Sequence, residues 1–259
     1  MRTLVGFIAR RRSALVAAGA VVLLAAGGLA WREARESARL VRVMADTIPA
    51  DPALMRLGIR RGASVFAGQC ASCHGKDGHG DRLRGVPDLG DNDYLYGQGS
   101  PSDIEQVIAY GIRSHHPKGW ALADMPAFAA LQSGKRQTEP LSPAQISDVS
   151  EFVHALGGGP ADLAAVSRGS AVYNGPGGCF DCHGADAAGD SSIGAPNLTD
   201  GIWLYGDGGR EAIARSISVG RAGVMPAFKP RLRPVQIRAV ALYVYSLSHP
   251  RPQQPAKAP

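Results

Sequence analysis

Apolar residues recur at helical spacing in several separate stretches of the chain, and no stretch alternates apolar and polar residues long enough to predict a sheet. A middle helix is expected over Asp103–Ile112, after Ser102 and with Glu105 completing a capping box. Two closing helices are expected to start at Pro143 and Pro234, and the first follows Ser142. The pattern predicts an all-α fold.

The N-terminal region contains one long uncharged stretch, Ser13–Trp31, behind Arg10, Arg11 and Arg12. At 1.5 Å per residue it makes a helix of roughly 28 Å, close to the thickness of a bilayer core. We therefore expect a transmembrane helix, with residues 1–44 forming a membrane anchor and stalk. The competing interpretation is a cleaved signal peptide, because Gly28-Leu29-Ala30 has the small residues of a cleavage site.

The net charge of +6 comes entirely from this N-terminal region. Residues 1–42 hold eight arginines and two glutamates, whereas the remaining residues hold 20 basic and 20 acidic side chains. The body of the protein therefore carries no basic excess for phosphate groups, and we expect no nucleic-acid partner.

The rest of the chain repeats itself at an offset of about 107–109 residues. Two homologous domains are predicted, each with an opening helix before a cysteine pair and a closing helix at its end. We expect a linker over residues 45–59, domain 1 over 60–157, a linker over 158–167, domain 2 over 168–249 and a flexible tail over 250–259. The matched strings are Cys70-Ala71-Ser72-Cys73-His74 with Cys179-Phe180-Asp181-Cys182-His183, and Met125-Pro126-Ala127-Phe128 with Met225-Pro226-Ala227-Phe228.

All four cysteines lie in the two C-x-x-C-H strings, a spacing typical of covalent haem c attachment. Cys70 and Cys73, and then Cys179 and Cys182, are the expected attachment sites, with His74 and His183 as iron ligands. A zinc ribbon would place its two C-x-x-C strings much closer together, and a thioredoxin-type pair would need strands. Two haem c groups would also supply core that a chain with 6% aromatic residues lacks.

Met125 and Met225 are the candidates for the sixth iron ligand, each downstream of the histidine in its own repeat. Histidine–methionine ligation fills both axial positions, which favours electron transfer over substrate binding. Other candidate ligands are His79, His115, His116, His154 and His249.

Pro87 and Pro196 each follow their histidine by 13 residues, and their carbonyl groups could fix the second ring nitrogen of that histidine. The alternative is that these prolines only shape the loop. Leu89 and Leu198 are expected to pack on a haem face.

Each repeat resembles a class I cytochrome c domain, and the strings Gly194–Gly206 and Gly223–Phe228 closely resemble subunit III (CcoP/FixP) of cbb3-type haem-copper oxidases. The resemblance implies crossed N- and C-terminal helices in each domain, with His74–Met125 and His183–Met225 as axial pairs. It also implies that electrons pass from a cytochrome c or bc complex to a terminal oxidase. Repeat 1 departs from the pattern by an insertion, Ser114–Trp120.

The expected function is that of a membrane-anchored di-haem cytochrome of a respiratory chain, an electron carrier and not an enzyme. Because covalent haem c is attached outside the cytoplasm, we expect the haem domains on the periplasmic side of a bacterial inner membrane. The alternatives are a cytochrome subunit that accepts electrons from a periplasmic dehydrogenase, and a di-haem peroxidase.

Overall fold

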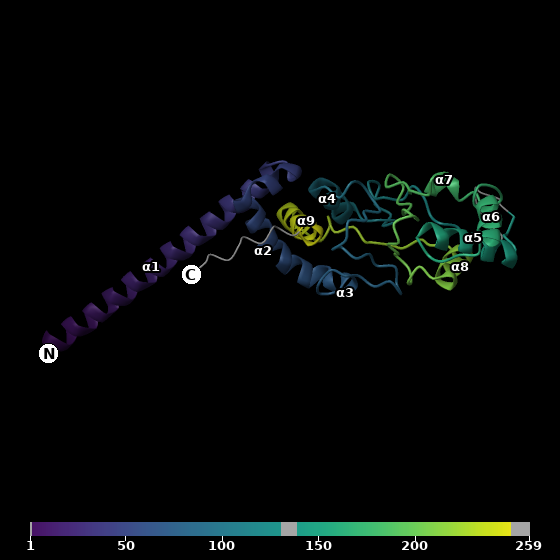
Figure 1. Cartoon of the computed structure of the whole chain (residues 1–259). Helices are drawn as coiled ribbons and strands as arrows, with labels where there is room; N and C mark the ends of the chain where they lie inside the picture. Colours follow the sequence, from purple (N-terminus) through teal and green to yellow (C-terminus); the bar gives the residue numbers. More distant parts are fainter. Residues whose placement is uncertain (1, 131–138, 250–259) are drawn as a thin grey trace, which may run out of the picture. The chain divides into compact units, whose positions relative to one another are not determined.

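The computed structural model describes residues 2–130 and 139–249, and the expected tail over 250–259 lies outside the described residues. The chain divides into two compact units, residues 1–44 and 45–259 (Figure 1). The first unit contains a single helix, α1, over Arg2–Arg42. Within the described part of the chain, no helix combines the length and the apolar content that a bilayer span requires.

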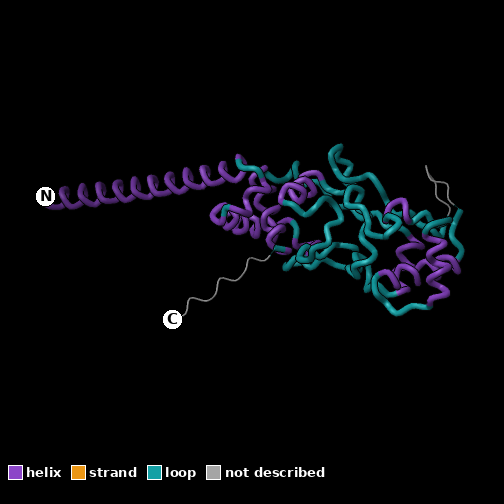
Figure 2. The backbone as a smooth tube through the Cα atoms, turned by 45° about the horizontal axis from the view of Figure 1, so that its top comes forward, coloured by secondary structure: helices purple, strands orange, loops and turns teal. Residues whose placement is uncertain are grey.

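The second unit consists of helices and connecting loops, so the expected all-α fold is confirmed (Figure 2). Across the described residues, paired extended backbone occurs only as isolated bridges and not as strands. The helices of this unit are η1 (Ala45–Ala50), α2 (Pro52–Gln69), α3 (Ala71–His74), α4 (Pro101–Tyr110), α5 (Pro143–Leu156), α6 (Leu163–Tyr173), α7 (Phe180–His183), α8 (Arg210–Val219) and α9 (Pro234–Ser248).

The predicted start of α5 is confirmed. Gln145 N donates to Ser142 Oγ at 3.2 Å, and Ser142 N donates to Gln145 Oε1 at 2.8 Å, which completes a capping box. The predicted cap of the middle helix is wrong by two residues, because Ser100 and Asp103 form the box that begins α4.

Both expected linkers are shorter than predicted because helices begin inside them. Within residues 45–59, Asp51 Oδ1 accepts hydrogen bonds from Ala53 N and Leu54 N and so caps α2. Within residues 158–167, Asp162 caps α6 in the same way. An aspartate directly before an apolar helical run is itself a helix-start signal in both places.

The helices form two lobes that interleave the two sequence repeats. Lobe 1 consists of η1, α2, α3, α4 and α9, and lobe 2 consists of α5, α6, α7 and α8. In lobe 1, α2 and α4 of repeat 1 pack against α9 of repeat 2; in lobe 2, α5 of repeat 1 packs against α6 and α8 of repeat 2. Figure 1 shows the yellow α9 beside the blue α2, and the teal α5 beside the green α6. The expectation that each repeat packs its own opening and closing helices is therefore wrong.

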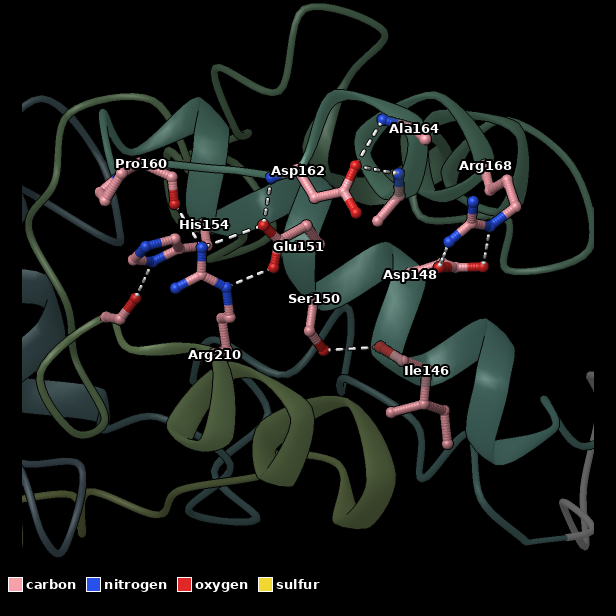
Figure 3. Close-up of polar contacts among 12 residues, drawn as sticks. Ile146, Asp148, Ser150, Glu151, His154, Pro160, Asp162, Ala164, Arg168 and Arg210 are labelled. Atoms are coloured by element: carbon pink, nitrogen blue, oxygen red, sulfur yellow. Dashed lines mark hydrogen bonds and ion pairs between the residues drawn. The ribbon is translucent and has the colours of Figure 1, made fainter.

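Ion pairs tie α5 into lobe 2 (Figure 3). Arg168 Nη2 on α6 lies 2.7 Å from Asp148 Oδ1 on α5. Arg210 at the start of α8 donates from Nη2 to Glu151 Oε1 at 2.9 Å, and Glu151 also accepts from Asp162 N at 2.8 Å. The closing helix of repeat 1 is thus attached by polar contacts to α6, to α8 and to the segment that precedes α6.

A glycine lies at each main helix crossing. A Cβ atom on Gly62 of α2 would collide with the backbone of Ala239 on α9, and one on Gly169 of α6 would collide with the backbone of Asp148 on α5. The missing side chains allow the opening and closing helices to approach closely.

The chain passes from lobe 1 to lobe 2 along residues 112–125 and returns along residues 221–225, and these two segments are hydrogen-bonded to each other. Ile112 and Met225 exchange two backbone hydrogen bonds of 2.9 Å, and Met125 and Arg221 exchange bonds of 3.0 and 2.9 Å. Beyond each crossing, the Met-Pro-Ala-Phe string docks on the other repeat: Phe228 N donates to Ile108 O, and Phe128 N donates to Ile217 O.

Candidate haem sites

Each lobe contains one C-x-x-C-H string, and its histidine is the last residue of a short helix, α3 in lobe 1 and α7 in lobe 2. None of the four cysteines is paired with another in a disulfide. Burial first, and then the neighbouring Cys73, raise the pKa of Cys70 to about 11, so this thiol is protonated at neutral pH. Two separate thiol pairs, one in each lobe, fit two haem c attachment sites and do not fit a single zinc ribbon.

The two histidines have the protonation that an iron ligand needs. His183 Nδ1 donates to the carbonyl of Pro196 at 3.0 Å, which leaves the lone pair of Nε2 free. Burial lowers the pKa of His183, and the Pro196 carbonyl opposes this effect only in part. The imidazole is therefore neutral at neutral pH, with its free nitrogen available to a metal.

The counterpart in lobe 1, His74, differs in its hydrogen bonding. Burial lowers the pKa of His74 as well, and the carbonyl of Pro87 acts against it. However, His74 Nδ1 is buried and has no hydrogen-bond partner among the described residues. A metal bound at Nε2 would not satisfy Nδ1, so in lobe 1 the Pro87 carbonyl lies beside the imidazole without the full hydrogen bond that Pro196 accepts in lobe 2.

The two methionines lie in the lobes opposite to those predicted. Met225 packs against the apolar cluster of lobe 1, which also includes Cys70 and Leu89 at its border. Met125 packs against the cluster of lobe 2, together with Cys179 and Leu198. The chain changes lobes between each histidine and the next methionine, so this placement does not favour the pairing expected from sequence order, His74 with Met125 and His183 with Met225, which stays a prediction.

Half-buried apolar side chains pack against the core of each lobe. In lobe 1 they include Leu89, Tyr94 and Met225; in lobe 2 they include Met125, Leu198 and Trp203. A flat apolar macrocycle would bury these side chains. The residues present therefore fit the group that the cysteine strings predict.

The other histidines make contacts away from the two C-x-x-C-H strings. His79 Nδ1 lies 3.0 Å from Asp88 at the surface, and that carboxylate raises its pKa. His154 Nδ1 donates to Gly208 O, while His116 and His249 contact tyrosine rings. His115 is exposed in the inserted loop.

One residue near the lobe 2 site was not singled out by the sequence patterns. The hydroxyl of fully buried Tyr173 donates to the carbonyl of Gly184, directly after His183, at 2.7 Å. Phe66 takes the equivalent position in lobe 1 and has no hydroxyl group. The sequence signal for this contact is that repeat 2 has Tyr173 where repeat 1 has Phe66.

Comparisons with known proteins support two cytochrome c domains. Residues 59–157 match the family described as cytochrome c, and residues 164–244 match the family described as cytochrome c oxidase, cbb3-type, subunit III. The chain is 40% identical over 215 residues to the cbb3-type cytochrome c oxidase subunit FixP of Azorhizobium caulinodans, covering 83% of this chain and 68% of the relative. It is 44% identical over 217 residues to the subunit CcoP of Rhodobacter capsulatus, covering 81% and 69% respectively.

Proposed function

The chain belongs to the family of subunit III of cbb3-type cytochrome c oxidases, and on that premise we propose that it carries electrons to the catalytic core of such an oxidase. Two covalent haem c groups supply reversible one-electron iron centres. Cys70 and Cys73 hold one group in lobe 1, and Cys179 and Cys182 hold the other in lobe 2. The donor in this proposal is a cytochrome c or bc complex.

The observation that carries the proposal is that each lobe holds the C-x-x-C-H histidine of one repeat and the methionine of the other. His74 with Met225 would hold the iron in lobe 1, and His183 with Met125 would hold the iron in lobe 2, as their shared lobes support. A thioether in the sixth position raises the iron potential and leaves no open site for a substrate. This arrangement suits a carrier and disfavours a peroxidase.

Membrane attachment is part of the same proposal. The uncharged stretch Ser13–Trp31 acts as the anchor, with Arg10–Arg12 on the cytoplasmic side. Residues 45–259 then lie in the periplasm, where haem c is attached and where a soluble or membrane-bound donor can reach them.

Single-haem variants test the axial pairs directly. In a C179A/C182A background only the lobe 1 haem remains, and its ferric thioether-to-iron absorption band should disappear with Met225→Ala and persist with Met125→Ala. In a C70A/C73A background the result should be reversed. Loss of the band with the methionine of the same repeat in both backgrounds would refute the exchanged pairs.

The role as oxidase subunit is tested in membranes of the native host. The protein purified in mild detergent should retain a haem-copper catalytic subunit, and its reduced haems should be reoxidised rapidly by oxygen. Deleting the catalytic subunit should abolish that reoxidation without reducing the haem content. Rapid reoxidation in the deletion strain would contradict the proposal.

A further inference from the structure

Arg113 joins the two segments that lead to the methionines. Its Nε donates to Gly223 O at 2.7 Å, and its Nη1 donates to Ala123 O at 3.0 Å. Gly223 precedes Met225 by two residues, and Ala123 precedes Met125 by two residues. A single guanidinium group thus contacts equivalent positions on both methionine loops.

The local backbone is arranged to present this side chain. Arg113 has a φ of 48°, an uncommon value for a residue with a Cβ atom, so the surrounding contacts must hold it there. The inserted loop supplies such contacts: Arg113 N donates to Trp120 O at 2.7 Å, and Trp120 N donates to Gly111 O at 3.0 Å. The insertion of repeat 1 therefore shapes the bend that carries Arg113.

Burial and a neighbouring carboxylate also favour one fixed position for the Arg113 side chain. The Arg113 side chain is only 21% exposed, and its Nη1 lies 3.4 Å from Asp124 Oδ1. A planar guanidinium can donate in several directions at once, which a lysine ammonium cannot do with the same geometry. In repeat 2 the aligned position, 109 residues later, is Ala222, so the molecule has one such bridge and not two.

The backbone bridges around Arg113 show what it stabilises. Met225 and Met125 are each held by hydrogen bonds to the crossing segments, at Ile112 and Arg221. Gly111 and Gly220, both with positive φ, let these segments pass close to the methionine carbonyls. The side chain of Arg113 spans this crossing from one methionine loop to the other.

We infer that Arg113 is a positioning residue for both axial methionines and couples the two loops mechanically. The inference rests on the proposed methionine ligation of both haems. Removing the guanidinium should loosen both thioethers together, although Arg113 belongs to only one repeat.

The test compares Arg113→Ala with the wild type in the full-length di-haem protein and in each single-haem background. Imidazole competes with the thioether for ferric iron, so its affinity reports how firmly each methionine is held. Loss of a charged hydrogen bond to each loop should raise that affinity about tenfold at each haem, equivalent to about 1.4 kcal/mol. The thioether-to-iron band should weaken at both haems. Arg32→Ala, which removes a surface ion pair with Glu36 on α1, is the control and should change neither quantity.

The outcomes separate the inference from the proposed function. Absence of the thioether band in the wild type would refute methionine ligation itself. A normal wild type with unchanged imidazole affinity in Arg113→Ala, or a change at one haem only, would overturn the role of Arg113. If Arg113→Ala does not mature, Arg113→Lys decides: a raised affinity at both haems supports the inference, and wild-type affinity at both refutes it.

Discussion

At the scale of single residues, Asp93 lies in a surface loop of lobe 1 near two other carboxylates. Burial first, and then the charges of Asp200 and Asp91, raise the pKa of Asp93 from 3.8 to about 6. Asp200 belongs to repeat 2, so this repulsion acts between loops of the two repeats. The negative charge at neutral pH is thus unfavourable in the folded protein.

Replacing Asp93 by asparagine should stabilise the protein only where the carboxylate is charged. A carboxyl group whose folded pKa is raised contributes stability below its unfolded pKa, and that contribution is lost as the pH rises through about 6. As the pH rises from about 4 to about 7, the free energy of unfolding of Asp93→Asn should therefore increase relative to that of the wild type. Chemical denaturation at several pH values measures the difference. Parallel curves for Asp93→Asn and the wild type would contradict the prediction.

Tyr173 offers a second test at this scale, because its hydroxyl has no counterpart on Phe66, the equivalent residue of lobe 1. Tyr173→Phe should lower the free energy of unfolding by about 1 kcal/mol, since the Gly184 carbonyl loses its hydroxyl donor. Guanidinium denaturation followed by absorption of the lobe 2 haem, in the C70A/C73A background, measures this loss. An unchanged midpoint would mean that water replaces the hydroxyl without cost.

At the scale of helices, Gly169 sets the closest approach between α5 and α6. Gly169→Ala should destabilise the protein by about 1–3 kcal/mol, because the new methyl group meets the Asp148 backbone and the helices must separate. Gly68→Ala is the matched control: Gly68 is also helical but has open space around it, and alanine there should stabilise by roughly 0.5–1 kcal/mol. Thermal denaturation of the two variants should therefore shift in opposite directions. Equal shifts would show that helix propensity, and not the crossing, governs both sites.

Helices and attachment sites were predictable from local signals, but their partners were not. Ser142, Pro143 and Gln145 define a helix start through backbone chemistry within four residues, and the C-x-x-C-H strings define the thiols and the histidine in the same local way. Local sequence does not decide whether α5 or α9 packs against α2. Both closing helices carry similar apolar stripes, because the repeats are homologous, so periodicity alone fits either pairing. The decision lies in the crossing segments, where Gly111 and Gly220 allow close backbone approach.

At the scale of the whole molecule, the exchange of closing helices links the two repeats physically. The segment before Gly158 supplies α5 to lobe 2, and the segment after it supplies α9 to lobe 1. Gly158 has a φ of 85° and nothing close to its Cβ position, so a protease site can be inserted there. A cut at this point breaks the chain between the two repeats but removes no helix from either lobe.

The cut protein should therefore remain one particle. Separation would require α5 and α9 to leave their lobes together and to expose buried side chains such as Val149 and Val240, as well as the ion pairs of Asp148 and Glu151. Native size-exclusion chromatography should show a single peak with two haems per complex, while a denaturing gel should show two haem-stained fragments. Adding denaturant before the column should split the peak, which proves that cleavage was complete. Two separate native peaks with one haem each would instead indicate tandem domains, each closed by its own helix.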